Sequence, residues 1–404
     1  MAFEVINFGC RLNSYESEII KEFLKNDIEY KDKEIVIFNS CCVTQEAERQ
    51  LIQNIKKVRK EKKNVLLGVV GCAVQVNKDK YLNMPEVDFV FGNNDKMDFG
   101  NYSNIKEKTS VVSDVHKINR LSGKLVSGFE GKVRAFIQIQ NGCDNHCTFC
   151  LTRLARGYSI STPSDKIVEQ VNKLVDNGYK EIVLTGVDIS DYGKRLDEDI
   201  NLGKLIKKIL NETSIERLRI SSIDISQLNQ DLIDVLCYEK RLMPHIHLSL
   251  QSGDNTILRK MARRNTREEV IEKCHLLKSL RPEIIFGADM IAGFPTETEE
   301  MHKNSLKIIQ EIPITFGHIF PYSIRPETVA GKMPQVDMHI RRERAKELRA
   351  EAEKNLNNLR NSLKGTTQKV LIENAHSGRL ENYLQVELDG DYNDFVNKII
   401  DIKL

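Results

Sequence analysis

The sequence contains no tryptophan, and aromatic residues make up only 6% of its 404 residues. It therefore offers no obvious aromatic platform on which the bases of single-stranded nucleic acid could stack. No apolar run reaches the roughly 18 residues that a transmembrane helix needs, so no membrane segment is predicted. The first ten residues, MAFEVINFGC, lack the charged start and long apolar core of a secretory signal.

The chain also has almost no excess of charge of either sign. The chain carries 60 lysines and arginines against 58 aspartates and glutamates, so its net charge is only +2. This balance produces no overall basic field of the kind that attracts nucleic acid. Basic residues do gather in three runs, and such runs are more often solvated helix faces than contact surfaces. The runs are 56–63, 260–267 and 339–349, and together they keep an RNA partner as a hypothesis.

Cysteine, by contrast, occurs nine times. In the absence of a secretory signal, this predicts a reducing compartment, the cytoplasm, and thiols used in metal binding or catalysis. The length, with 40% hydrophobic and 29% charged residues, fits a globular protein of two or three domains.

Three of the cysteines follow three successive predicted strands. Short apolar runs alternate with amphipathic segments over residues 3–71, which indicates β-α units and a parallel sheet. Cys10, Cys41 and Cys72 each follow one of these runs, at intervals of 31 residues. Because the carboxyl ends of parallel strands share one edge, the three thiols can converge on one site. The alternative is that they are small buried apolar residues.

Three other cysteines receive simpler interpretations. Cys42 adjoins Cys41, and successive side chains of an extended segment point to opposite sides, so we expect only one of the two to face the shared site. Cys237 and Cys274 lie in apolar helical stretches, which is typical of packing residues.

The rest of the chain predicts two further parts. Six apolar runs alternate with helical segments, which favours a curved, partly closed β/α barrel. Residues 93–132 are polar and irregular, and we expect them to link this barrel to the first sheet. A charged helix over 337–364 ends at Gly365 and precedes three short alternating strands. The predicted fold class is α/β, with an N-terminal parallel β-α domain at 1–125, a partial β/α barrel at 130–364 and a small β-module at 365–404.

The segment NGCDNHCTFC places the remaining three cysteines directly after the first barrel strand. Cys143, Cys147 and Cys150 have the spacing C-x-x-x-C-x-x-C. Zinc and iron–sulfur sites usually take four protein ligands, so three thiols leave one position open, as a catalytic site requires. His146 could complete a zinc site, but its place inside the loop would strain a tetrahedron. A zinc knuckle and three unrelated thiols are the alternatives.

This loop, read with its barrel, resembles the radical S-adenosylmethionine enzymes. In that family three cysteines hold a 4Fe–4S cluster, and the methionine moiety of the cofactor binds the open iron. The resemblance implies that Cys143, Cys147 and Cys150 bind such a cluster with S-adenosylmethionine, from which a 5′-deoxyadenosyl radical forms. The protein then supplies position and electrostatics, while the cofactor supplies the chemistry.

The N-terminal cysteines narrow the resemblance to the methylthiotransferases. The segments NFGCRLNSYESE, NSCCVTQEAERQ and VVGCAVQ look like that family's three ligand motifs. The resemblance covers nearly the whole chain and implies a second 4Fe–4S cluster on Cys10, Cys41 and Cys72, which would present the sulfur. It also implies a C-terminal RNA-binding β-barrel called TRAM, a tRNA substrate, an electron donor and a sulfur donor. Cys41, and not Cys42, occupies the family's ligand position.

Further positions match the family. LTGVDIS places Gly186 in a turn near the methionine end of the cofactor, and two later motifs place Gln251 and Asp289 near the cofactor. For these two, polar residues that satisfy strand ends are the alternative. Arg156 and Arg325 are expected to face substrate or cofactor, because a guanidinium group suits carboxylate and phosphate.

Within the family, the motifs look most like the type that modifies threonylcarbamoyl-adenosine beside the anticodon of tRNA. Arg11-Leu12 follows the first cysteine, where the isopentenyl-adenosine type has Gln-Met and the ribosomal-protein type has Pro-Lys. The resemblance implies insertion of a methylthio group at carbon 2 of that nucleoside, with the other two substrates as alternatives. Residues 151–153 and Glu327 depart from the family pattern. Alternatives of a different class are an iron–sulfur electron carrier and a zinc-stabilised RNA-binding protein.

Overall fold

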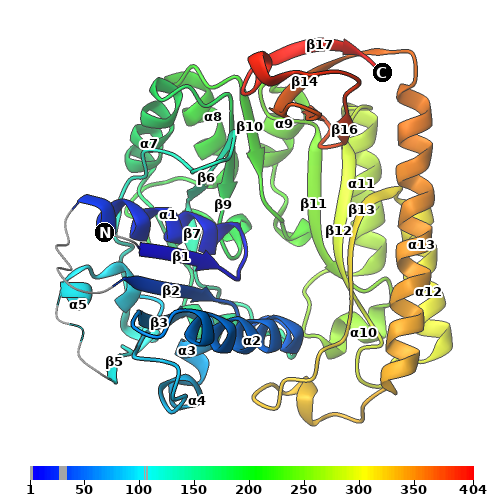
Figure 1. Ribbon diagram of the computed structural model, residues 1–404. Helices are drawn as coiled ribbons and strands as arrows, with labels where there is room; N and C mark the ends of the chain where they lie inside the picture. Colours follow the sequence, from blue (N-terminus) through cyan, green and yellow to red (C-terminus); the bar gives the residue numbers. More distant parts are fainter. Residues whose placement is uncertain (1–2, 27–33, 104, 106–107) are drawn as a thin grey trace.

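Most strands of the computed structural model, which describes residues 3–26, 34–103, 105 and 108–404, are parallel. Figure 1 shows an N-terminal sheet, two parallel half-sheets in the middle and an antiparallel sheet near the C-terminus. The α/β class predicted from the sequence is thereby confirmed. None of the helices in the described ranges combines the length and the apolar character needed to cross a membrane.

The N-terminal sheet is parallel, in the order β1-β2-β3-β4-β5. Its strands are β1 (Phe3–Asn7), β2 (Ile35–Ser40), β3 (Leu66–Gly71), β4 (Phe89–Phe91) and β5 (Thr109–Val111). Its helices are α1 (Arg11–Asn26), α2 (Gln45–Glu61), α3 (Cys72–Val76), α4 (Lys78–Leu82) and α5 (Gly100–Ser103). The hydroxyl of Thr44 caps α2 by accepting a hydrogen bond from the Ala47 amide.

The first three strands confirm the predicted β-α units. The expectation that residues 93–132 are irregular was wrong, because β5 and α5 lie within them. Strand β5 has only three residues, and its ladder with β4 defines it rather than any apolar alternation of its own.

The middle of the chain forms a curved β/α barrel that does not close. Parallel strands run in the order β10-β9-β6 in one half and β11-β12-β13 in the other, and the bridges Leu218–Leu242 and Ile223–Leu248 join the halves. The strands are β6 (Arg134–Gln138), β9 (Glu181–Thr185), β10 (Arg217–Ile220), β11 (His245–Gln251), β12 (Ile285–Ala292) and β13 (Ile314–Pro321). These are the six predicted barrel strands.

Helices pack against the barrel strands and bury one continuous apolar core. This core extends from Tyr15 of α1, through the strands, to Ala352 of the long C-terminal helix, so the N-terminal part packs directly on the barrel. The helices are α7 (Ser164–Asp176), α8 (Leu202–Glu212), α9 (Gln230–Tyr238), α10 (Asn255–Lys260), α11 (Arg267–Leu280), α12 (Glu299–Glu311) and α13 (Met338–Leu363).

The C-terminal strands form an antiparallel sheet that packs on the end of α13. Its order is β16-β15-β14-β17, with β14 (Thr367–Asn374), β15 (Ser377–Leu380), β16 (Gln385–Glu387) and β17 (Ile399–Lys403). The sheet has two edge strands, β16 and β17, so these described strands do not form the closed barrel that we expected. The sequence also did not reveal β15, whose four residues include a glycine and an arginine.

Candidate active site

The cysteines of the N-terminal sheet lie at its carboxyl edge, as the strand pattern predicted. Cys10 stands between β1 and α1, Cys41 directly follows β2, and Cys72 begins α3 after β3. Cys72 is buried, Cys41 is half-buried and Cys10 is exposed. The three thiols therefore occupy adjacent loops on one edge of the sheet.

Cys42 also lies beside Cys72 and is only 4% exposed. The hydrogen bond between these two thiols lowers the pKa of Cys72 well below its ordinary value and raises the pKa of Cys42. Burial, and then the charge of Cys72, raises the pKa of Cys41 to about 12, so Cys41 is near Cys72 as well. Both adjacent thiols thus lie near Cys72, but of the two only Cys42 lines the cavity described below; β2 ends at Ser40, so strand alternation does not extend to either of them.

Backbone pairing fixes the base of the loop that carries Cys143, Cys147 and Cys150. Strands β7 (Gln140–Asn141) and β8 (Ile160–Ser161) pair at its base, and helix α6 (Thr152–Arg156) follows it. Gly142 has a φ of 70°, and a Cβ there would lie 1.9 Å from the carbonyl oxygen of Tyr158. Only glycine fits this approach, which sets the path of the chain into Cys143.

Two thiols of this loop, Cys143 and Cys147, are partly shielded from water, whereas Cys150 is exposed. Burial and the charge of Asp188 raise the pKa of Cys143 to about 12. Burial also raises the pKa of Cys147, although Arg263 Nη1, 3.8 Å from its sulfur, opposes this effect. A bound metal would therefore displace protons from these thiols.

The cysteine sulfurs stand wider apart than a zinc site requires. Thiolates on one tetrahedral zinc ion lie about 3.8 Å from one another. Among the described residues, no three cysteine sulfurs come within 4.8 Å of one another. His146 contacts Arg153, and both line a space together with Cys147 and Cys150.

A buried charge network joins helix α1 to the cysteine loop. Glu16 accepts hydrogen bonds from Arg156 at 2.8 and 3.1 Å and from Lys96 at 2.6 Å. Burial alone would raise the pKa of Glu16, but the two cations outweigh it and lower this pKa to about 2. The guanidinium of Arg156 also donates to Asn13 and Asn141. The structure thus places Arg156 inside this network and not among the residues that line the large cavity described below.

Gly186 lies in the turn that follows β9. A Cβ there would lie 2.8 Å from the carbonyl oxygen of Gln140, and the side-chain oxygen of Gln140 accepts hydrogen bonds from the amides of Val187 and Asp188. Asp188 in turn accepts a hydrogen bond from Asn145, inside the cysteine loop, at 2.8 Å. Burial, with the charges of nearby carboxylates, raises the pKa of Asp188 to about 6. This turn therefore braces the loop that carries Cys143.

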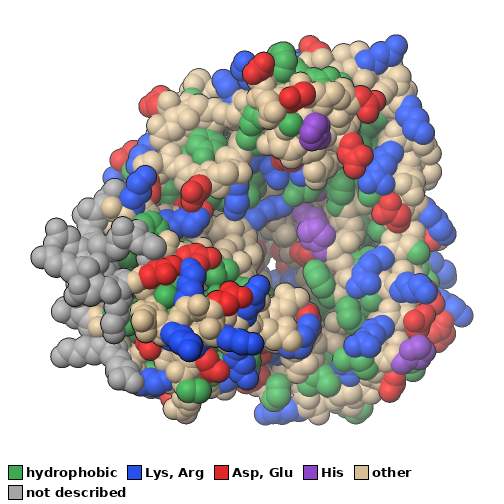
Figure 2. Space-filling view, viewed as in Figure 1, with side chains coloured by type: hydrophobic (Ala, Val, Ile, Leu, Met, Phe, Trp, Pro, Cys, Tyr) green, Lys and Arg blue, Asp and Glu red, His purple; other side chains and the backbone are tan. Residues whose placement is uncertain are grey.

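One cysteine of each set lines the same cavity. A space of about 390 Å³ is lined by Cys10 and Cys42 from the N-terminal sheet and by Cys150 from the barrel loop. Gln251 and Asp289 line the same space, from the ends of β11 and from β12. Figure 2 shows the molecule hollowed between the N-terminal sheet and the strands of the barrel. Of the residues expected near cofactor or substrate, Gln251 and Asp289 are thus brought to this cavity.

Gln251 and Asp289 have unusual surroundings. Gln251 has a φ of 68°, in the left-handed region that non-glycine residues seldom adopt. Such backbone strain concentrates at functional sites. Burial alone would raise the pKa of Asp289, but the imidazoles of His247 and His318 beside it hold this pKa below its ordinary value.

Arg325 links the loop after β13 to helix α2. Its Nη1 donates to Glu48 Oε2 at 2.8 Å, and the side chain is buried. Its Nε and Nη2 make no hydrogen bond within the described residues. Both atoms are buried, and Arg325 is not among the residues that line the large cavity.

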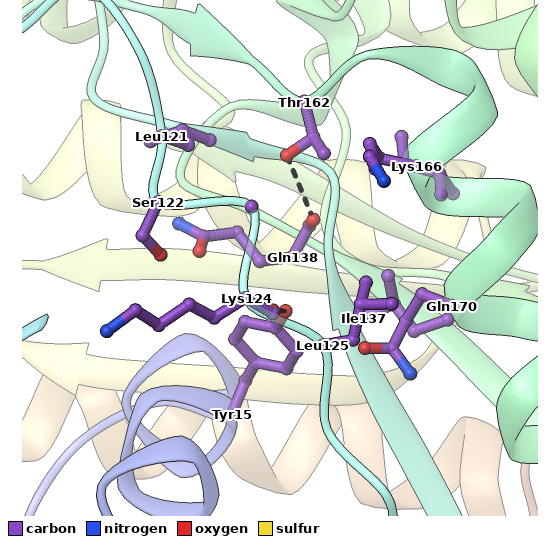
Figure 3. Close-up of a pocket in the computed structure, with 12 residues that line it drawn as sticks. Tyr15, Leu121, Ser122, Lys124, Leu125, Ile137, Gln138, Thr162, Lys166 and Gln170 are labelled. Atoms are coloured by element: carbon purple, nitrogen blue, oxygen red, sulfur yellow. Dashed lines mark hydrogen bonds between the residues drawn. The ribbon is translucent and has the colours of Figure 1, made fainter. Parts of the chain in front are cut away.

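A second, much smaller space lies where α1, the segment 121–125 and helix α7 meet (Figure 3). It is lined by Tyr15, Gln138 and Gln170 among others, and Thr162 donates a hydrogen bond to the backbone oxygen of Gln138 at 3.2 Å. Its volume is about 10 Å³, which accommodates no more than one water molecule. We regard it as a packing seam.

The sequence analysis did not single out Glu16, Lys96, His247 and His318. Glu16 and Lys96 leave no simple pattern, because their partners come from distant segments. The two histidines do leave a weak sequence pattern, because each lies within an apolar strand, where ionisable side chains are uncommon.

Comparison with known proteins agrees with this geometry. A model described as the radical SAM superfamily matches residues 137–309, and one described as uncharacterized protein family UPF0004 matches residues 2–92. The chain is 45% identical to the threonylcarbamoyladenosine tRNA methylthiotransferase MtaB of Rickettsia prowazekii, over 96% of this chain and 91% of the relative. It is 35% identical to the MtaB of Aquifex aeolicus, over 96% and 97%.

More distant similarities point the same way. The tRNA-2-methylthio-N(6)-dimethylallyladenosine synthase of Clostridium botulinum is 30% identical over the whole of this chain and 94% of the relative. Among solved structures, the radical S-adenosylmethionine methyltransferase TsrM of Kitasatospora setae shares the fold, with a TM-score of 0.57, 13% identity and coverage of 82% and 77%. The full-length similarity and the two matched models together show that the chain belongs to the radical S-adenosylmethionine methylthiotransferases.

Proposed function

We propose that this enzyme inserts a methylthio group at carbon 2 of threonylcarbamoyl-adenosine next to the anticodon of tRNA. The observation that carries the proposal is the cavity at which Cys10 and Cys150, one from each cysteine set, line the same space. A reaction that joins a sulfur group to a radical needs both sites to face one substrate. The choice of nucleoside rests on relatives that carry this name at 32–45% identity over nearly their full length.

The residues present fit two iron–sulfur clusters. Cys143, Cys147 and Cys150 would hold one 4Fe–4S cluster, with S-adenosylmethionine at its open position, and Cys10, Cys41 and Cys72 would hold the second. Each set supplies three thiols on loops at the carboxyl ends of parallel strands, where ligands bind in such folds. When bound, these groups supply the radical and the sulfur to be transferred.

The surrounding side chains would position the cofactor and the substrate. Gln251 and Asp289 offer polar groups on the cavity wall, and the turn at Gly186 supports the Cys143 loop from behind. Arg325 has two unpaired donors that suit a carboxylate or a phosphate of the substrate. Arg156 is satisfied by Glu16, so we assign it to holding the cysteine loop rather than to contacting substrate.

The proposed partners are tRNA, an electron donor and a sulfur donor. We propose that the sulfur-bearing cluster is held by residues 1–125 and that the radical is generated within residues 130–364. We propose that tRNA is contacted by residues 365–404. Because the cysteine thiols must stay reduced to bind clusters, we place the enzyme in the cytoplasm.

Mass spectrometry of nucleosides from tRNA tests this proposal. A strain that lacks the gene should lose the methylthio form of threonylcarbamoyl-adenosine, and the wild-type chain should restore it. The variants Cys72→Ser and Cys150→Ser should fail to restore it, while Cys237→Ser, in helix α9 away from both sets, should succeed. If this nucleoside is unchanged, the substrate assignment is wrong. A loss of the isopentenyl-type nucleoside, or of the modified aspartate on the ribosomal protein, would then identify the substrate.

A further inference from the structure

Three neighbouring barrel strands each bring one metal-binding side chain to the same place. His247 lies on β11, Asp289 on β12 and His318 on β13, and Asp289 and His318 are direct register partners. Within the described part of the chain, these are the histidine, cysteine and carboxylate donors that gather in a group of three, with all ligand atoms within 4.8 Å of one another. Figure 1 shows the three strands side by side, and Figure 2 shows histidine in the hollow over them.

The distances suit ligands of one ion. His247 Nε2 lies 3.1 Å from Asp289 Oδ1, and His318 Nδ1 lies 3.4 Å from the same oxygen. Ligand atoms about 2.1 Å from a metal are separated by about 3.0 Å at a right angle and by about 3.4 Å at a tetrahedral angle. Both contacts fall at these separations.

The contact between His247 and Asp289 is longer than an ordinary histidine–carboxylate hydrogen bond. His247 Nε2 is buried and lies 3.1 Å from the carboxylate oxygen. His302 shows the contrast, because its Nε2 forms a hydrogen bond with Glu347 Oε2 at 2.7 Å.

The backbone makes room for this arrangement. A Cβ at Gly287 would lie 2.4 Å from His247 Nδ1, so glycine at this strand position leaves the space that the ring occupies. The ligands stand on paired strands and not on loops, which fixes their separation before an ion binds.

We propose that His247, Asp289 and His318 bind a divalent transition-metal ion. Two imidazoles and one carboxylate on one face form a set that such ions favour, and it leaves coordination positions open. Asp289 lines the large cavity, so these open positions would be accessible to an oxygen or nitrogen donor of a ligand held there. Its second oxygen, Oδ2, lies 3.4 Å from the hydroxyl of Ser222 and takes no part in the ligand contacts described above. This proposal goes beyond the proposed function and does not depend on it.

Cobalt binding to the purified, iron-containing protein tests the proposal. The protein is dialysed to equilibrium against micromolar Co²⁺, and cobalt and iron per chain are measured by elemental mass spectrometry. We expect about one cobalt per chain with iron content unchanged. The variants His318→Ala and Asp289→Asn should weaken cobalt binding at least about tenfold, as loss of a metal-site partner typically does.

The control variant is His275→Ala, which removes an exposed histidine of α11 outside the site. It should bind cobalt as the wild type does. His318 has a half-exposed side chain, so its removal is unlike a buried substitution and should leave the fold intact. Absence of cobalt from the wild-type protein, or equal binding by His318→Ala, would overturn the proposal. Cobalt uptake matched by loss of iron would also overturn it, because the thiols would then be the site.

Discussion

Replacing Glu16 by glutamine should loosen the junction between helix α1 and the cysteine loop. Arg156 and Lys96 lower the pKa of this buried carboxyl from 4.5 to about 2. One pKa unit corresponds to about 1.36 kcal/mol, so the charged form contributes about 3 kcal/mol at neutral pH. Breaking a buried ion pair from one side typically costs a similar amount, about 3–5 kcal/mol.

The contribution of Glu16 should depend on pH in a defined direction. A carboxyl whose pKa is lower in the folded state stabilises that state above its unfolded pKa, and the stabilisation is lost as the pH falls toward the folded value. For Glu16 this window extends from about 4.5 down to about 2. At pH 3, one unit above the folded pKa, about 1.4 kcal/mol should remain.

Hydrogen exchange of the α1 amides measures this effect locally, without requiring the whole chain to unfold in one step. The Glu16→Gln variant should exchange about 100-fold faster than the wild type at pH 7, and about tenfold faster at pH 3, each compared at the same pH. Glu46→Gln is the matched control, because Glu46 lies on the surface of α2 and pairs with exposed Arg49. Equal exchange in Glu16→Gln and the wild type, or a ratio that does not shrink in acid, would refute the reasoning.

Three further predictions follow from other parts of the structure. Gly142→Ala should push the cysteine loop away from Tyr158, so the iron content per chain, measured by elemental analysis, should fall by about half. Gly123→Ala is the control, because Gly123 has open space around it, and it should not change the iron content. Tyr383→Ala should speed proteolysis between α13 and β14 several-fold, because it removes the ring stack on His245 and the hydrogen bond from Arg11. Tyr383→Phe should retain the ring stack, and Tyr238→Ala, which changes an exposed side chain, should not alter the rate of proteolysis. If the C-terminal helix and sheet contact tRNA phosphates, affinity in a filter-binding assay should fall about tenfold or more between 50 and 200 mM salt, and a flat response would contradict that role.

Local patterns were sufficient for the elements that carry the cysteines. The strands before Cys10, Cys41 and Cys72 are apolar runs bounded by helices, and the sheet places all three thiols at one edge as the pattern required. Where the pattern was short the prediction failed, as for β5, which owes its conformation to pairing with β4. The rule of strand alternation does not apply to Cys41 and Cys42, because the strand has already ended.

Some site residues could be placed from the sequence, and others could not. Gln251 and Asp289 could be placed near the cofactor only through their resemblance to family motifs, and both line the cavity, Gln251 from the end of β11 and Asp289 from within β12. Arg156 could not be interpreted from its neighbours in sequence, since its partner Glu16 is 140 residues away. A guanidinium alone predicts that an anion will bind, but it does not say whether that anion belongs to the substrate or to the protein.

The sequence by itself determined the identity and spacing of the thiols, the parallel β-α order and the family, because these depend on residues close together in the chain. Only the tertiary structure decided which groups face one another across the cavity. Cys10 and Cys150 both line it, and Lys96 and Arg156 both pair with Glu16, because segments far apart in the sequence pack together. The alignment of His247, Asp289 and His318 likewise arises from strand register, which no single segment of the sequence specifies.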